Sequence, residues 1–376
     1  MSEHNWSALD RRTFLKAAGA AVALGTVGGA LAACGGGSSA ASSTAAAAPV
    51  AMKPDGDINV FNWAQYMDPK VISGFEAKYG IKVHQTYFDN MDSMMAKLNA
   101  GVMFDIIFPE NAEAMKLVQA GKLLALDHTQ LKSWSDILPY FDDPWYDPGA
   151  KFTAPYSLWT TGIGWHANEL GELPASWDTL WNTPKADGKI FLLDDSREVI
   201  GMSLMRLGLD PNSTNPDDIN KATDALLTLM PQVRGFSSVN TQFINNTAWM
   251  QEMWSGQAWQ AISQMKDPQN VRFASVPNQT PLNNDTIAIP ANAEHPGSAM
   301  LFLDWVLSPQ TVGQNISYTG YPQATKAGVE AYNTMTKDYA FLALDANAIA
   351  TTKHFEPLKP QDLALWNAAW LKIKAA

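Results

Sequence analysis

The fold is decided by residues 57–110, which read DINVFNWAQYMDPKVISGFEAKYGIKVHQTYFDNMDSMMAKLNAGVMFDIIFPE. Residues 58–63 predict a strand. Asp68 and Pro69 then begin a helix, because Asp is a favoured N-cap and Pro is favoured at the first helical position. Gly80 ends that helix, since glycine readily adopts the left-handed conformation found at helix C-termini. The stretch therefore opens with a strand followed by a helix.

The same alternation of strand and helix continues to the end of this stretch. A strand begins at residues 81–84, a helix near Met94 is closed by Gly101, and residues 104–108 form the short apolar run typical of a buried parallel strand. Strand, helix, strand, helix, strand is a βαβαβ unit with right-handed crossovers. Ligands of such sheets bind beyond the carboxyl ends of the strands, which here are marked by Trp63 and Glu110.

The rest of the chain predicts more α/β structure, and a second block begins near residues 162–165. Residues 190–193 predict an apolar strand, and residues 286–290 predict another. Residues 363–373 carry apolar side chains spaced as one face of a helix. A chain of 376 residues suggests two domains, so we expect a two-domain α/β protein.

The N-terminus carries targeting signals. Asp10–Lys16 reads DRRTFLK, a twin-arginine export signal, and an apolar small-residue stretch follows it. Residues 31–34, LAAC, match a bacterial lipobox, in which Cys34 takes a diacylglyceryl group and becomes the mature N-terminus. We therefore expect residues 1–33 to be a twin-arginine lipoprotein signal and residues 34–55 to be a flexible, Gly/Ser/Ala-rich tether. The expected location is periplasmic or otherwise extracytoplasmic, with a lipid anchor in the membrane.

Composition limits the possible partners. The formal net charge of −11 at pH 7 argues against nucleic acid, because phosphate binding needs a basic surface. Cys34 is the single cysteine, and lipidation would consume it, so no disulfide is expected in the mature chain. After the export signal no stretch reaches about 18 uninterrupted apolar residues, so a soluble body is expected.

Catalytic motifs are absent from the sequence. It contains no G-x-S-x-G, no H-E-x-x-H, no G-x-x-x-x-G-K-[ST] and no G-x-G-x-x-G after a strand. Its six histidines are scattered without the spacing of metal ligands. We therefore expect no catalytic residue, no metal and no cofactor, and a chain that is not an enzyme.

Acidic and aromatic side chains gather instead near the ends of predicted strands, where ligands bind in a crevice between domains. They are Trp63, Tyr66, Glu110, Asp195, Glu198, Asp285 and Tyr321. Asp195 and Glu198 also fit a plainer role in the first turn of a helix, whose dipole favours acids. For the aromatic members, packing in a core is the plainer alternative.

Several stretches of the chain resemble one known family. The most specific is residues 192–202, LLDDSREVIGM, which continues through Leu207 to residues 214–216. Less specific matches are FNWAQY at 61–66, GIKV at 80–83, FDIIFP at 104–109, IAIPANA at 287–293 and GYP at 320–322. Together they span about residues 57–345. They are similar to bacterial extracytoplasmic spermidine/putrescine-binding proteins, the receptors of polyamine ABC importers.

The resemblance implies a type II periplasmic-binding-protein clamshell with mixed sheets flanked by helices. Lobe one would hold residues 56–161 and 287–322, and lobe two residues 162–286 and 323–376. A monomer of this kind would capture a putrescine- or spermidine-like polyamine between its lobes and deliver it to an ABC permease in the inner membrane. The same fold could instead bind another cationic amine, an opine, thiamine, iron or a sugar.

The resemblance also implies roles for the site residues. Asp195 and Glu198 would hold amine nitrogens, and Asp285 would pair with another. Three rings would line the lobe-one wall or pack on the methylene chain: Trp63, Tyr66 and Tyr321. The chemistry agrees, because a desolvated ammonium needs carboxylates or several acceptors, and a cation is attracted to ring faces.

Some positions depart from the pattern of the family. Glu110 stands where the family usually has a small hydroxyl residue, and Gln264 and Asn283 stand where it is usually aromatic. Asp267 could supply the acid used by putrescine-preferring members. Fewer rings and more amides favour a ligand that is more polar than spermidine, or weaker binding.

Overall fold

The computed structural model describes residues 50–276, 279–280, 282–344 and 354–376. The expected export signal, Cys34 and most of the expected tether lie outside this part of the chain. Within it, no helix combines the length and the apolar character needed to cross a bilayer.

The N-terminal βαβαβ unit forms as the sequence predicts. β1 (Ile58–Trp63) pairs in parallel with β2 (Val83–Phe88) and with β3 (Ile106–Ile107), and α1 (Pro69–Tyr79) and α2 (Met91–Asn99) connect these strands. Asp68 caps α1 by accepting a hydrogen bond of 2.7 Å from the backbone N of Lys70. Gly80 closes the helix with a φ of 70°, as a left-handed C-terminus requires.

The nine strands of the described part form one sheet, which is held together by a long strand, β4 (Thr153–His166). The order is β2-β1-β3-β9-β4-β7-β5-β6, and β8 also pairs with β4. Residues 153–160 of β4 pair antiparallel with β9, whereas residues 161–165 pair antiparallel with β7. The other strands are β5 (Ile190–Leu192), β6 (Val233–Phe236), β7 (Met250–Trp254), β8 (Val271–Ala274) and β9 (Leu282–Ala288).

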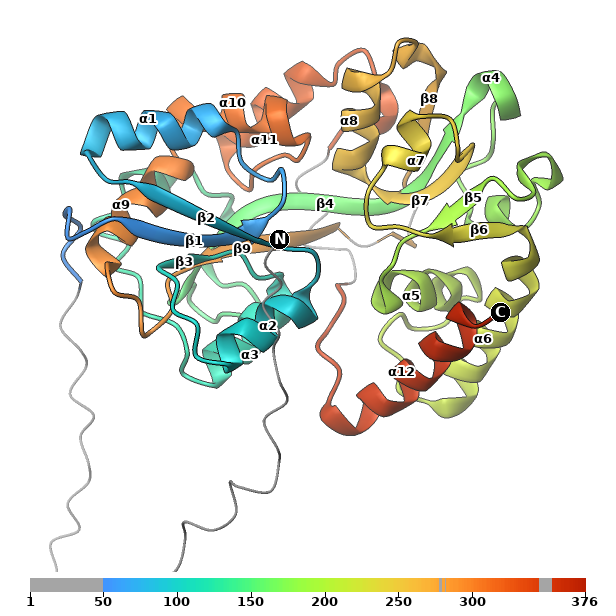
Figure 1. The fold of residues 1–376 in the computed structure, drawn as a ribbon, viewed down its shortest axis with the longest axis horizontal. Helices are drawn as coiled ribbons and strands as arrows, with labels where there is room; N and C mark the ends of the chain where they lie inside the picture. The colour runs from blue at the N-terminus through green and yellow to red at the C-terminus, as the bar shows by residue number, and fades with distance from the viewer. Residues whose placement is uncertain (1–49, 277–278, 281, 345–353) are drawn as a thin grey trace, which may run out of the picture. The chain divides into compact units, whose positions relative to one another are not determined.

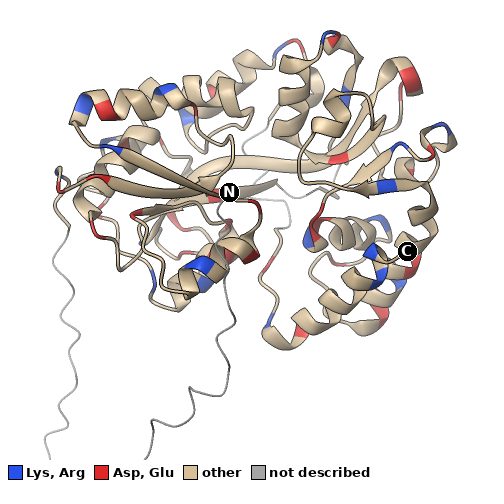
Figure 2. Ribbon diagram, viewed as in Figure 1, with Lys and Arg blue, Asp and Glu red and all other residues tan. Residues whose placement is uncertain are grey.

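Helices cover both faces of the sheet at each end of β4 (Figure 1). At one end α1, α9 and α10 lie on one face, and α2 and α3 lie on the other; at the far end α7 and α8 face α5, α6 and α12 across the sheet. The remaining helices are α3 (Asn111–Gln119), α4 (Ala167–Leu170), α5 (Ser196–Arg206), α6 (Pro216–Leu229), α7 (Thr241–Ile244), α8 (Ser255–Gln264), α9 (Pro296–Val306), α10 (Pro309–Thr319), α11 (Lys326–Met335) and α12 (Pro360–Lys374). Charged residues lie mostly on these helices and on turns (Figure 2).

Two large groups of buried apolar side chains explain this architecture. One group surrounds the first half of β4 and includes Phe75, Leu158 and Phe302. The other surrounds its second half and includes Ile163 and Leu226. Since each fully buried side chain of this size is worth about 1.5–3 kcal/mol, each group can stabilise a lobe of its own. The result is a two-lobed α/β protein with a mixed sheet.

Three elements differ from the sequence-based expectation. The strand expected at residues 286–290 is β9, which begins at Leu282, because the polar residues 283–285 are buried by pairing with β4. β7 was not predicted, since Gln251 and Glu252 are polar although both are fully buried. In α12 the apolar face is narrower than its sequence indicates, since Leu363 remains 39% exposed.

Candidate functional site

A cavity of about 370 Å³ lies at the carboxyl ends of β1 and β7. Its walls are formed by Trp63, Ala64, Gln65, Tyr66, Phe88, Asp89, Glu110, Trp159, Ser238, Val239, Asn240, Thr241, Trp254, Gln257, Gln260, Asp285 and Tyr321. Three of these residues are acids, and none is Lys, Arg or His. In the described ranges no three His, Cys, Asp or Glu side chains are arranged to hold a metal ion. The cavity therefore suits an organic cation.

Asp285 is the most fully bonded acid of the cavity. It lies on β9, and its Oδ2 accepts hydrogen bonds from the Tyr66 hydroxyl and, at 3.2 Å, from Ser157 Oγ. Its Oδ1 is buried and has no hydrogen-bond partner among the described residues. Burial raises the pKa of Asp285, while the side chains of Tyr66, Ser157 and Trp159 lower it. The carboxyl is thus held in place with one oxygen left for a positive partner.

Aromatic rings enclose this carboxyl. The ring of Tyr66 lies edge-on to that of Tyr321, with their centroids 5.3 Å apart. Tyr321 in turn packs on Gly256 of α8, where a Cβ would come within 2.4 Å of its Cζ, so only glycine fits at this position. Burial raises the pKa of Tyr66, so its hydroxyl stays protonated and remains a donor.

Two tryptophan rings form a second aromatic wall of the cavity, which begins beside Asp285. It is formed by Trp159 of β4 and Trp254, the last residue of β7, whose ring centroids are 6.2 Å apart. The indole Nε1 of Trp254 donates a hydrogen bond of 2.9 Å to Oε1 of Glu198. Glu198 does not line the cavity itself but lies directly behind this wall, 4% exposed.

The first turn of α5 carries two acids that lie behind this second wall. Asp195 is the N-cap, and its Oδ1 accepts from the backbone N of Arg197 at 2.7 Å and of Glu198 at 3.2 Å. Burial and the neighbouring Asp195 raise the pKa of Glu198 to about 8. Burial also raises the pKa of Asp195, although the two capping bonds oppose that shift. Glu198 is therefore poised to change its charge near neutral pH.

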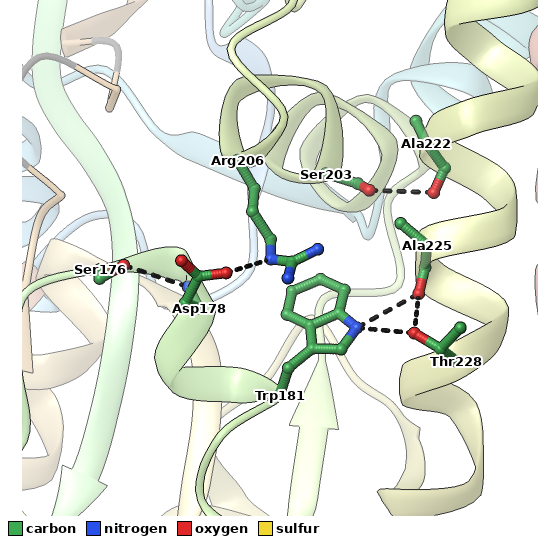
Figure 3. A network of polar contacts seen from close by, with 8 residues as sticks. All are labelled: Ser176, Asp178, Trp181, Ser203, Arg206, Ala222, Ala225 and Thr228. Atoms are coloured by element: carbon green, nitrogen blue, oxygen red, sulfur yellow. Dashed lines mark hydrogen bonds and ion pairs between the residues drawn. The ribbon is translucent and has the colours of Figure 1, made fainter.

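A polar network fixes the other end of α5 (Figure 3). Arg206 Nε donates to Asp178 Oδ1 at 2.7 Å, and its guanidinium stacks 4.0 Å above the Trp181 ring. Trp181 Nε1 donates to the carbonyl oxygen of Ala225 in α6, and Ser203 Oγ donates to that of Ala222 at 2.9 Å. These contacts hold α5 against α6.

The sequence-predicted residues divide into four groups. Those brought together in the cavity wall are Trp63, Tyr66, Glu110, Asp285 and Tyr321. Asp195 and Glu198 lie behind the second aromatic wall, in the first turn of α5. Asn283 is 2% exposed on β9, two residues before Asp285, and does not line the cavity. Gln264 and Asp267 lie exposed at and after the end of α8, away from it.

Sequence reasoning missed both members of the second aromatic wall, Trp159 and Trp254. Trp254 stands ten residues before Gln264, to which the family's aromatic position was assigned. It is the last residue of a strand and is followed by Ser255 and Gly256. A position at a strand end is the signal that identified the predicted site residues, so the same signal could have found Trp254. Glu252, which is buried two residues before Trp254 in β7, was also missed. Its Oε2 accepts a hydrogen bond of 3.2 Å from the backbone N of Leu193.

Together, the two-lobed fold and the acid- and ring-lined cavity define a solute-binding protein of the periplasmic clamshell type. The chain belongs to the bacterial extracellular solute-binding protein family, whose profile matches residues 70–343. This membership confirms the prediction of a binding protein rather than an enzyme.

Named relatives agree with this assignment. The chain is 32% identical over 341 residues to the putrescine-binding periplasmic protein of Escherichia coli K12, covering 85% of this chain and 91% of the relative. It is 31% identical to spermidine/putrescine-binding periplasmic protein 1 of Haemophilus influenzae, covering 75% and 78%. Among solved structures, the spermidine/putrescine ABC transporter substrate-binding protein of Streptococcus pneumoniae superposes with a TM-score of 0.73 at 27% identity, covering 85% and 99%.

Proposed function

We propose that this chain is the solute-binding component of an ABC importer and captures a polyamine in its cavity for delivery to a permease. The observation that carries the proposal is the cavity wall, which combines Asp285 and Glu110 with a cage of aromatic rings and contains no basic side chain. The relatives named for putrescine and spermidine support the same ligand class.

The chemistry of the walls matches that of a polyamine. Each ammonium group must exchange its water for charged or polar acceptors when it enters the cavity. Asp285 offers its Oδ1 at one wall, and Glu198 and Asp195 lie behind the other. Between them the methylenes would pack on flat rings, and a cation over a ring face gains about 0.5–2 kcal/mol.

The proposal assigns the two halves of β4 to different lobes. The boundary expected between residues 161 and 162 falls within β4, one residue after the strand changes its partner from β9 to β7. Lobe one would hold residues 56–161 and 287–322, and lobe two 162–286 and 323–376. The pairing of residues 282–286 of β9 with β4 favours counting that short segment with lobe one.

The test is isothermal titration calorimetry of the purified chain with putrescine, cadaverine and spermidine. We expect a dissociation constant in the micromolar range or below, about −8 kcal/mol. Asp285→Asn keeps the shape of the side chain but removes its charge, and should weaken binding at least about tenfold. Absence of heat and of any melting shift with all three amines would refute the proposal. Native mass spectrometry of freshly purified protein would then identify any other solute it carries.

We further propose that the protein acts outside the cytoplasm and is held at the membrane by lipid on Cys34. The support is the order of the twin-arginine motif, the apolar stretch and the LAAC sequence at residues 31–34. Cys34→Ser should move the exported chain from the membrane fraction to the soluble fraction, whereas Arg11→Lys with Arg12→Lys should block its export. A Cys34→Ser chain that stays with the membrane would contradict lipid anchoring at this residue.

A further inference from the structure

Glu110 lines the cavity at the start of α3, where its side chain does not contribute to capping the helix. It is the N-cap of α3, yet its side chain makes no capping hydrogen bond, and Glu is not among the residues favoured at that position. The side chain instead lines the cavity. Its location therefore indicates that the side chain contacts the ligand.

Glu110 and Asp285 stand directly opposite each other. Their backbones form an isolated antiparallel bridge, and both side chains line the same cavity. Directly opposed residues have Cβ atoms about 5 Å apart. That spacing is close to the roughly 5 Å between the two nitrogens of an extended aminopropyl unit, as standard bond lengths give it. The pair can thus face two neighbouring nitrogens of one chain.

The charges around the cavity are not balanced by a diamine. Asp285 has a buried oxygen without a partner among the described residues. Glu198 and Asp195 supply two acids behind Trp254, with one positive charge, Arg197, near both. One terminal ammonium group of a diamine would pair with Asp285, and the other would approach Asp195 and Glu198. Glu110 would then be left without an ammonium partner. Burial raises the pKa of Glu110, and the charges of Asp285, Glu113, Asp195 and Glu198 add to that shift in this order.

We propose that Glu110 selects amines that carry an internal ammonium group, so that triamines bind in preference to diamines of the same length. The inference rests on the proposed function and concerns its ligand class. An internal ammonium has two N–H donors, which would bond the half-buried carboxylate of Glu110, whose side chain makes no capping hydrogen bond. A methylene at the same place would leave that carboxylate unpaired or force it to bind a proton.

A matched pair of ligands tests this directly. Norspermidine and 1,7-diaminoheptane have chains of equal length and differ only in the central group, a secondary ammonium in the first and a methylene in the second. Calorimetry at about pH 7.5 should show norspermidine binding about tenfold more tightly or better, as expected for one charge-assisted hydrogen bond. In Glu110→Gln and in Glu110→Ser this ratio should fall toward one, through loss of affinity for norspermidine.

Asp89→Asn is the matched control, since Asp89 also lines the cavity but is exposed at its rim. It removes the same charge and should lower both affinities by a similar small factor, leaving the ratio unchanged. Equal affinities in the wild type, or an unchanged ratio in both well-folded Glu110 variants, would overturn the inference while the proposed function stands. Failure of both compounds and of putrescine and spermidine to bind would overturn the proposed function itself.

Discussion

The indole Nε1 of Trp254 lies 2.9 Å from Oε1 of Glu198 and donates a hydrogen bond to it. Trp254 lines the cavity, whereas Glu198 is buried behind it. The bond lowers the pKa of Glu198, which burial and Asp195 raise to about 8. One indole therefore both shapes the wall and sets how readily the carboxyl behind it carries charge.

Trp254→Phe tests this relationship, because it keeps a ring but removes the donor. We expect the affinity for putrescine or spermidine to fall about tenfold, since a hydrogen bond to a charged group is worth about 1.5–3 kcal/mol. Calorimetry measures the affinity, and the quenching of tryptophan fluorescence by ligand should also shrink. Trp249→Phe is the control, because Trp249 precedes the same strand without lining the cavity. Equal affinity in the two variants would contradict a role for the Trp254 bond.

Tyr66→Phe removes the hydroxyl that donates to Asp285 Oδ2. Because that bond lowers the pKa of Asp285, its loss should raise the pKa further and weaken the charged form that pairs with an amine. We expect about tenfold weaker binding at neutral pH, with the loss recovered in part at higher pH. Titrations at several pH values measure both effects.

Tyr146→Phe is the matched control for Tyr66→Phe. Tyr146 is a buried tyrosine whose hydroxyl accepts a hydrogen bond of 2.9 Å from Nδ2 of Asn284, the residue beside Asp285 on β9. Because alternate residues of a strand point to opposite faces, this bond lies on the face away from the cavity. The variant should lose about 1 kcal/mol of stability and keep its affinity. Loss of affinity in both variants would show only that β9 tolerates no change.

The fold was predictable where apolar patterning and caps agree. Asp68, Pro69 and Gly80 fixed α1 to the residue, and the parallel pairing of β1 with β2 and β3 followed from the strands' apolar character and their helical connections. β7 and the first half of β9 escaped prediction for one reason. Their polar side chains, such as Glu252 and Asn283, are buried because both strands pair with β4 inside the sheet, so the apolar pattern that marks a buried strand is absent there.

The candidate site was predictable only in part for a related reason. Residues that follow a strand end, such as Glu110 and Tyr66, could be found because the end of a strand is readable from sequence, and Asp285 was found although it lies inside β9. The wall of Trp159 and Trp254 could not, since Trp159 lies in the middle of β4, where the strand changes its partner from β9 to β7. The resemblance assigned the family's aromatic position to Gln264, which the fold exposes at the end of α8.

Affinity for amines should rise with pH across the neutral range. The pKa values of Asp285 and Glu198 are both raised by burial, Glu198 to about 8, and an ammonium pairs with their ionised forms. Binding must therefore displace protons below that pH, and the affinity should increase from about pH 5 to about pH 8. Calorimetry in buffers of different ionisation enthalpy measures the protons released. Glu198→Gln should flatten the upper part of the profile, and a pH-independent wild type would contradict the assignment.

The stability of the ligand-free protein should show the opposite trend for the same residue. Because the pKa of Glu198 is higher in the folded chain than the 4.5 of an unperturbed glutamate, the folded state binds more protons between 4.5 and about 8. Its contribution to the free energy of unfolding is therefore present at low pH and is lost as pH rises through that window. Urea unfolding of the wild type and of Glu198→Gln at several pH values measures this contribution of Glu198 to the free energy of unfolding. Parallel curves would mean that Glu198 does not titrate there.

Arg206→Ala should destabilise the chain without changing its ligand affinity. The side chain makes an ion pair with Asp178, whose side chain is 55% exposed, and stacks 4.0 Å above the Trp181 ring. An exposed pair contributes at most about 1 kcal/mol, and the stacked cation about as much again, so a loss of about 1–2 kcal/mol is expected in thermal or urea unfolding. Asp178→Ala removes only the ion pair and should cost less than Arg206→Ala. Equal losses would assign the whole effect to the ion pair, and weaker amine binding in Arg206→Ala would mean that this network, at the far end of α5, also holds Asp195 and Glu198 in position.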